Sequence, residues 1–278
     1  MGGWGRERDA QPLNSRYRLE GDGTGKKGKV YSLAVPLERD GPQYPKFHKT
    51  WMVTYYESNP PLENRVVGDD VVMMQSHSGT HIDALCHMWN SGQMYNGHSP
   101  DHATGSGITR SGIENVPWMV GRGVMLDIPR YRGVKHLRRG EVVTVDDLNG
   151  CCETQGVQVQ PGDVLLVRTG WYSLFYKDRS LWETGWPGPD DSMAPWIAEK
   201  EIIALGADNP SVEAMHSVPD PRWHPLHQRA LRDLGVYLIE NLDLEELAAD
   251  RVYEFLFVAA PIMLTGATGA PTNPLAII

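Results

Sequence analysis

The feature that most constrains this chain is a cluster of three histidines and one aspartate, His77-Ser-Gly-Thr-His81-Ile-Asp83-Ala-Leu-Cys-His87. Imidazole and carboxylate groups are metal ligands, and donors to one ion must lie about 2.0–2.2 Å from it. A straight strand would separate the backbones of His77 and His81 by roughly 13 Å. A straight helix would bring these two histidines together but turn Asp83 to the far side. A shared ion therefore requires a bent backbone.

Gly79 offers that bend, because glycine adopts turn conformations that are closed to other residues. An extended piece after it would place His81 and Asp83 on one face, two residues apart. Asp83 could also cap a helix that begins at the next residue, which would turn His87 back toward it. The spacing thus predicts a metal site with three ligands and one further histidine beside the ion. The alternative is a loop that carries surface histidines.

Further ligand types occur downstream. His224 and His227 flank Pro225-Leu226, and Glu240 ends a strand-like apolar run. A buried carboxylate at the end of a strand needs a partner, and a cation is one solution. Each of these residues could instead be structural or solvated. Three aromatic residues are candidate walls of a substrate pocket, with a plain core role as the alternative: Trp89, Tyr95 and Trp171.

Short apolar segments bounded by turn residues predict strands along the chain. Helical spacing separates several of them, but no regular strand–helix–strand repeat emerges. We therefore expect one α/β domain with a mixed β-sheet and flanking helices. Residues 1–28 are polar and glycine-rich and are expected to form a flexible N-terminal arm before a domain at 29–278. The expected strands are residues 30–36, 71–75, 123–128, 202–207, 236–240 and 255–259, and residues 162–170 are expected to form a turn followed by a strand. The expected helices begin at 145, at 192 with Ser192 as the capping residue, and at 226, the last ending at Gly235.

Composition excludes several classes of protein. The 278 residues are 41% hydrophobic and 22% charged, which is ordinary for a soluble globular enzyme. The formal net charge of -9, without a basic stripe, disfavours a nucleic-acid partner. The longest apolar stretch, residues 255–264, is about half of the roughly 20 residues that a membrane span needs. Three cysteines cannot form a disulfide framework, and the N-terminus has no apolar signal region, so we expect a cytoplasmic protein.

The histidine cluster, with His87, resembles the His-x-Gly-Thr-His-x-Asp signature of the cyclase family, which includes bacterial kynurenine formamidase and isatin hydrolase. Other segments agree in order along the chain. The resemblance covers about residues 30–278 and implies the swivelling β/β/α fold of that family. The agreeing segments are a Pro-Gly-Asp strand with a Thr-Gly-Trp turn at 161–171, Gly-x-Asp-x-x-Ser at 206–211, Glu-Asn at 240–241 and a C-terminal turn and strand at 266–277.

The resemblance also implies roles for individual residues. His87 would be the proton-transfer residue. In two-metal members a histidine and the glutamate of the Glu-Asn element bind a second ion, which here implies His227 and Glu240, with His224 as the competing histidine. The aspartate of the cluster would bridge the two ions. The implied ligands of the first ion are His77, His81 and Asp83.

The Gly-x-Asp-x-x-Ser segment suggests Asp208 and Ser211 as residues of the substrate pocket. Glu213 stands where many family members have aspartate, which leaves the identity of the substrate open. The resemblance implies a small-molecule substrate, one or two ions of zinc or manganese per subunit, and a homodimer or homotetramer.

These residues together predict hydrolysis of an amide, cyclic amide or lactone by metal-activated water, with His87 as general base. One alternative is a cyclase or dehydratase of a polyketide-like substrate, served by the same metal and histidine. Another is a metal-binding or small-molecule-binding protein without catalysis. The presence of His87 argues against that last class, because a pure binder needs ligands but no additional base.

Overall fold

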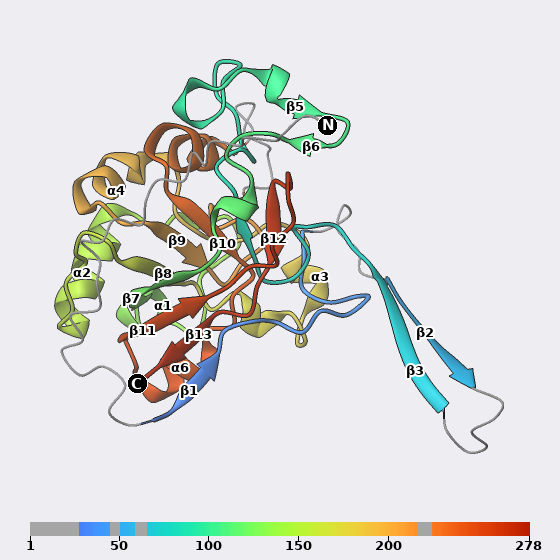
Figure 1. Ribbon diagram of the computed structural model, residues 1–278. Coiled ribbons are helices and arrows are strands. Elements are labelled where there is room, and N and C mark those ends of the chain that lie inside the picture. Colours follow the sequence, from blue (N-terminus) through green and yellow to red (C-terminus); the bar gives the residue numbers. More distant parts are fainter. Residues whose placement is uncertain (1–27, 45–50, 59–65, 216–223) are drawn as a thin grey trace.

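A nine-stranded mixed sheet forms the centre of the described structure, with strand order β1-β13-β11-β7-β8-β9-β10-β4-β12 (Figure 1). The computed structural model describes residues 28–44, 51–58, 66–215 and 224–278. Helices flank the sheet, so the expected α/β domain with a mixed sheet is confirmed. The strands of this sheet are β1 (Val30–Ser32), β4 (His81–Asp83), β7 (Met119–Asp127), β8 (Val164–Arg168), β9 (Ala204–Ala207), β10 (Tyr237–Glu240), β11 (Glu254–Ala259), β12 (Gly269–Pro271) and β13 (Leu275–Ile277).

The four central strands, β7 to β10, run parallel, and the outer strands pair antiparallel. Every residue of β8 is buried, as expected for a strand covered on both faces. Its side chains alternate between two core clusters. Val164 and Leu166 join the cluster on one face, whereas Leu165 and Val167 join the cluster on the other. Because side chains alternate along a strand, this one apolar run contributes to the core on both faces of the sheet.

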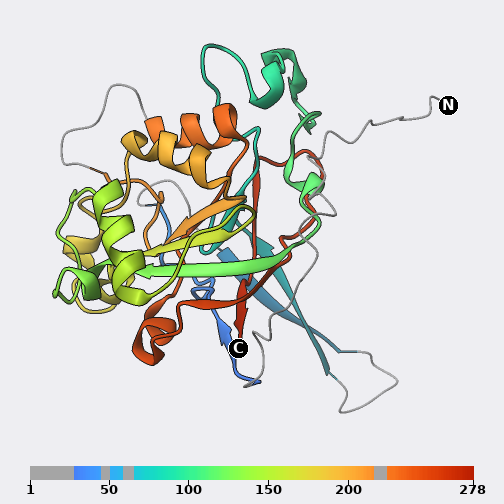
Figure 2. The same ribbon diagram turned by 90° about the vertical axis from the view of Figure 1, so that its left-hand side faces the viewer.

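Helices α2 and α4 lie together on one face of the sheet (Figure 2). The side chain of Thr144 accepts a hydrogen bond from the backbone N–H of Asp147, and the Asp147 side chain accepts one from the backbone of Thr144. Such a reciprocal cap stabilises a helix by about 1 kcal/mol. Gly156 ends α2 in the left-handed conformation. The helices are α1 (Ile128–Tyr131), α2 (Val145–Gln155), α3 (Arg179–Trp182), α4 (Ala194–Lys200), α5 (Pro225–His227) and α6 (Glu245–Asp250).

Short helical turns modify two of the expected helices. The segment at 192–200 begins with the 3-10 turn η6, and the side chain that accepts the Ser192 N–H is Asp190. The cap is therefore Asp190 rather than Ser192. The segment at 226–234 continues from α5 into a π-helical element, η7, and ends at Gly235 as expected. The short elements are η2 (Tyr95–Gly97), η3 (Pro100–His102), η4 (Ile113–Asn115), η5 (Tyr172–Leu174), η6 (Asp191–Met193), η7 (Gln228–Leu234), β5 (Ala103–Thr104) and β6 (Gly107–Ile108).

A long hairpin of β2 (Trp51–Ser58) and β3 (Val66–Met73) projects away from the main sheet (Figure 1). The sequence predicts only a strand at 71–75, at the end of the second strand of this hairpin. Of the expected N-terminal arm, residues 1–27 lie outside the described part of the chain. Within the described ranges, no helix is long and apolar enough to cross a membrane.

Candidate metal centre

The topology brings the histidine cluster beside Glu240. Strand β10 ends at Glu240, and β4 runs antiparallel to it, so that Glu240 pairs with His81 in the register. The carboxyl end of β10 and the start of β4 therefore meet at one edge of the sheet. Ligands of open α/β sheets bind outside the carboxyl ends of the parallel strands, where this cluster lies.

The backbone bends at Gly79, as the spacing requires. Gly79 has a φ of +60°, and a Cβ atom there would lie 2.5 Å from Cδ2 of Leu37. The chain then extends through β4, where His81 and Asp83 share one face and Ile82 is fully buried on the other. No helix follows Asp83. A single turn, in which the His87 N–H donates to the Ala84 carbonyl, brings His87 back instead.

Four of the predicted ligand side chains converge around the fifth, Asp83. Nδ1 of His77 lies 2.8 Å from Oδ1 of Asp83, and Nε2 of His81 lies 3.5 Å from the same oxygen. Nε2 of His81 is also 3.3 Å from Oε2 of Glu240. Nε2 of His227 lies 3.1 Å from Oε1 of Glu240 and 3.7 Å from Oδ2 of Asp83. Asp83 thus touches both the group predicted for the first ion and the group predicted for the second.

His87 lies against this group. Its ring centroid is 4.2 Å from that of His77 and 6.4 Å from that of His227. Burial lowers the pKa of His87 to about 3, against a smaller raising effect of Asp83, so its imidazole is neutral at pH 7. A nitrogen of His87 is also close enough to the donors of His77 and Asp83 for the three to hold one ion. Geometry alone therefore permits His87 either as a base or as a ligand.

The donor set fits a divalent cation. Burial alone would raise the pKa of Asp83, but His87, His77 and His81 hold it well below its usual range. Burial alone would lower the pKa of His81, yet Asp83 and Glu240 raise it to about 10. Oδ2 of Asp83 is buried and accepts no hydrogen bond. A buried anionic oxygen without a donor is costly, and a cation among these carboxylates would remove that cost.

The second nitrogen of His81 is held by the backbone. Its Nδ1 lies 2.9 Å from the carbonyl oxygen of Gly79, which also accepts a hydrogen bond from Nδ2 of Asn241. Because a carbonyl only accepts, Nδ1 carries a proton, and Nε2 is the nitrogen that faces the carboxylates. Asn241 adopts a positive φ of 54°, which asparagine tolerates better than most residues. The asparagine of the Glu-Asn element therefore holds the same carbonyl group that orients His81.

Two residues near His77 were not identified from the sequence. Oγ1 of Thr268 lies 2.9 Å from Nε2 of His77. A Cβ atom on Gly269 would lie 2.6 Å from Cε1 of His77, so only glycine leaves room for this ring. Both belong to the C-terminal Gly-Ala-Thr-Gly-Ala-Pro turn, whose motif was the available signal.

Of the two competing histidines, His227 enters the centre. Its Nε2 faces Asp83 and Glu240, as given above, whereas Nδ1 of His224 lies 3.3 Å from Oε1 of Glu213. The two rings are neighbours, with centroids 4.9 Å apart. The geometry therefore favours His227 over His224 as a ligand shared with Glu240.

The three aromatic residues predicted as pocket walls pack in three different hydrophobic clusters. Trp171 is fully buried and packs in a separate core cluster with Trp182 and Trp186. Tyr95 packs against Gly235 at the end of η7. Trp89 is partly buried and donates its indole N–H to the Cys86 carbonyl, 3.0 Å away. Their role in substrate binding stays a prediction.

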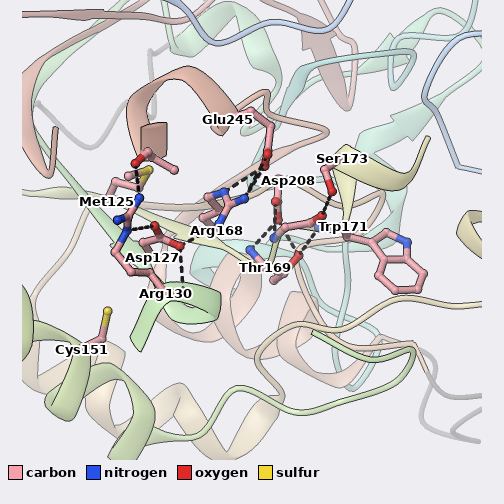
Figure 3. Close-up of polar contacts among 12 residues, drawn as sticks. Met125, Asp127, Arg130, Cys151, Arg168, Thr169, Trp171, Ser173, Asp208 and Glu245 are labelled. Atoms are coloured by element: carbon pink, nitrogen blue, oxygen red, sulfur yellow. Dashed lines mark hydrogen bonds and ion pairs between the residues drawn. The ribbon is translucent and has the colours of Figure 1, made fainter. Parts of the chain in front are cut away.

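Asp208 and Ser211 have structural partners. The Asp208 carboxylate accepts hydrogen bonds from the backbone N–H groups of Thr169 and Gly170, each at 2.8 Å (Figure 3). The Ser211 hydroxyl accepts the indole N–H of Trp186 at 2.6 Å and donates to the Glu213 carbonyl. Both residues lie near the carboxyl end of β9, next to β10 in the sheet. Their assignment to the substrate pocket also stays a prediction.

An arginine for a substrate carboxylate was not placed by the sequence. Arg168, at the end of β8, donates to Asp127 at 2.7 Å and to Glu245 at 2.9 Å and 3.0 Å (Figure 3). Arg130 donates to the same Asp127 and to the Ala248 carbonyl. These ion pairs engage the Arg168 guanidinium within the fold, which makes it a structural cation at this edge.

The fold and the centre together define an α/β protein with a buried cluster of histidines and carboxylates at the sheet edge. A family model described as "Putative cyclase" matches residues 31–214. The chain belongs to the cyclase family. A kynurenine formamidase of Geobacillus thermodenitrificans is 25% identical over 205 residues, which cover 73% of this chain and 76% of that protein.

Solved structures agree with this assignment. One described as a novel cyclase has a TM-score of 0.81 and 33% sequence identity, and the match covers 90% of this chain and 88% of that one. Isatin hydrolase A from Ralstonia solanacearum has a TM-score of 0.63 at 21% identity, covering 90% and 93% of the two chains, which shows a shared fold.

Proposed function

We propose that this chain is a metal-dependent hydrolase of an amide, cyclic amide or lactone in a small molecule. The observation that carries the proposal is the buried carboxylate of Asp83, whose Oδ2 accepts no hydrogen bond while His77, His81 and His227 surround it. The similarity to kynurenine formamidases and to isatin hydrolase supports this class of substrate. The cofactor is one or two ions of zinc or manganese per subunit.

The residues divide into two groups around Asp83. His77, His81 and Asp83 would hold one ion, and His227 and Glu240, with Asp83 shared, would hold a second. A divalent ion bound there would lower the pKa of a water molecule and polarise a substrate carbonyl. The ring of His87 lies beside His77, with ring centroids 4.2 Å apart, where it would accept the proton that the attacking water loses. It returns that proton to the leaving nitrogen or oxygen.

The test is a panel of formamides, cyclic imides and lactones, assayed with metal content measured by elemental analysis. We expect hydrolysis of at least one class by protein that contains zinc or manganese. Treatment with a chelator should abolish turnover, and added ion should restore it. Full activity in metal-free protein would rule the proposal out.

A substitution of His87 separates the role of base from that of ligand. His87→Asn keeps a polar side chain of similar size but removes proton transfer near neutral pH. We expect turnover to fall by a factor of roughly 100 to 10,000 while metal content is preserved. Loss of metal together with activity would make His87 a ligand. Retention of both would place the base elsewhere.

A further inference from the structure

Glu213 is a buried carboxylate that contacts a predicted ligand without facing the centre itself. Its Oε1 lies 2.5 Å from Nδ1 of His227 and 3.3 Å from the backbone nitrogen of the same residue. Its Oε2 accepts the N–H of Leu226 at 3.1 Å. Because a carboxylate accepts, Nδ1 of His227 carries a proton, and Nε2 is the ring nitrogen that faces Glu240 and Asp83.

The backbone next to Glu213 is strained and is held in place by its neighbours. Val212 has a φ of 54°, a conformation that is strained for a β-branched residue. The Val212 carbonyl accepts a hydrogen bond from Nδ2 of Asn209 at 3.0 Å. A Cβ atom on Gly188 would lie only 2.2 Å from that carbonyl oxygen, so glycine permits the close approach. Surrounding structure thus holds Val212 in this conformation and fixes the start of the Glu213 side chain.

We propose that Glu213 is a positioning residue, which orients His227 so that its Nε2 completes the second ion site with Glu240 and Asp83. This inference rests on the proposed function. Histidine ligands commonly donate their other N–H to a carboxylate, and loss of such a partner weakens metal binding by about 10- to 100-fold. Glu213 therefore acts on the second ion through His227, without touching it.

A competing arrangement uses Glu213 as a ligand. The donors of Glu213, His224 and His227 are close enough to hold an ion of their own. In that arrangement His227 would bind through Nδ1. However, each oxygen of Glu213 already accepts a backbone N–H, from Leu226 or His227. An ion there would compete with those donors, whereas the positioning role uses all of these contacts as they stand.

The experiment is titration of metal-free protein with zinc and with manganese, read as ion stoichiometry and affinity. Wild-type protein should take up two ions. Glu213→Ala should weaken the second ion by about 10- to 100-fold and leave the first unchanged. Glu213→Gln keeps an oxygen that can accept the Nδ1 proton but removes the negative charge, so it should weaken the second ion by about tenfold. Glu245→Ala is the matched control, because it removes a carboxylate paired with Arg168 at the same sheet edge.

His224→Ala distinguishes the two arrangements. Positioning predicts that this variant keeps both ions, and loss of the same ion as in Glu213→Ala would overturn the proposal. Wild-type affinity for both ions in Glu213→Ala would also overturn it. If circular dichroism shows that Glu213→Ala is unfolded, Glu213→Gln becomes the test of the proposal. Binding of two ions with wild-type affinity by Glu213→Gln would then overturn it. If the wild-type protein takes up only one ion, the role of Glu213 is overturned but the proposed function is not. If it takes up no ion, the proposed function itself is overturned.

Discussion

Asp83 is the residue on which both halves of the proposed centre depend. Oδ1 faces His77 and His81, and Oδ2 faces His227. Glu240 contacts His81 on one side and His227 on the other. Both carboxylates are buried. In the proposed centre Asp83 is shared by the two ions and Glu240 binds only the second, which makes their substitutions informative as a pair.

Asp83→Asn should therefore lose both ions, because the amide removes the charge that the two groups share. Glu240→Gln should lose one ion and keep the other. Elemental analysis of both purified variants checks this difference, with thermal unfolding as a test of the fold. Two ions retained in Glu240→Gln would exclude Glu240 as a ligand. One ion retained in Asp83→Asn would show that this residue does not bridge.

The cysteines give a prediction about pH. Burial raises the pKa of Cys86 to about 12 and that of Cys151 to about 12, whereas Cys152 is only partly buried. The thiolate is the reactive form, so a raised pKa keeps Cys86 and Cys151 as unreactive thiols up to pH 9. Mass spectrometry after alkylation at pH 7 to 9 should find Cys152 modified first, and all three modified in denaturant. Rapid alkylation of Cys86 in folded protein would contradict its burial.

At the scale of single residues, the sequence predicts what lies close along the chain. His77, His81, Asp83 and His87 were identified because the spacing of their donors can be tested against simple backbone geometry. Glu213 carries no such signal, because its contact with His227 spans 14 residues and depends on tertiary structure. A buried carboxylate and a surface carboxylate look alike in a sequence.

At the scale of elements, strand β12 shapes the centre although none of its residues is a proposed ligand. It pairs with β4, so that Gly269 lies opposite Asp83. The ring of His77 packs directly over Gly269, where a Cβ atom would approach Cε1 to 2.6 Å. A strand with a side chain at this position would push His77 away from Asp83.

Gly269→Ala should consequently lower the affinity of the first ion while the sheet remains intact. The added methyl group also approaches the Ile82 carbonyl oxygen to 2.8 Å, so a small loss of stability should accompany it. Metal titration and thermal unfolding measure the two effects. Gly121→Ala is a suitable control, because the nearest atom to a Cβ there is 3.9 Å away. Equal metal affinity in Gly269→Ala and wild-type protein would contradict this role.

Elements were predicted best where one segment contains its own signal. The apolar runs of β8 and β11 and the helical start at Val145 are local patterns, and the structure has these elements close to the expected positions. The order of strands in the sheet depends on contacts between distant segments and could not be derived from such patterns. The hairpin of β2 and β3 was missed because charged residues, Asp69 and Asp70, interrupt its apolar run.

At the scale of the molecule, that hairpin carries apolar side chains on both faces. Met52 pairs with Val72, and Val53 pairs with Val71, in adjacent register positions that point to opposite faces. All four side chains are more than half exposed. A two-stranded hairpin alone is marginally stable in water, and exposed apolar groups of this kind mark interaction surfaces. The expected homodimer or homotetramer would cover them.

We therefore predict that the wild-type chain associates and that the hairpin contributes to the contact. Light scattering should give a multiple of the chain mass, and Met52→Lys with Val72→Lys should shift it toward the monomer. These two lysines would face each other across the strands, where like charges are also unfavourable within the hairpin, so circular dichroism must show an intact fold. Val134→Lys, at an exposed position near α1, is the control and should leave the mass unchanged.

Deletion of residues 1–28 separates the predicted N-terminal arm from the hairpin. If the arm crosses to a partner's centre, the deletion should change kcat or KM while the hairpin maintains the associated mass. Unchanged kinetics would reject the arm as a lid but leave the hairpin contact in place. A monomeric mass for the wild-type chain at working concentration would reject association by either route. If the double-lysine variant still has an associated mass, only the role of the hairpin in association would be rejected. The apolar faces of the hairpin could then not be what holds the subunits together.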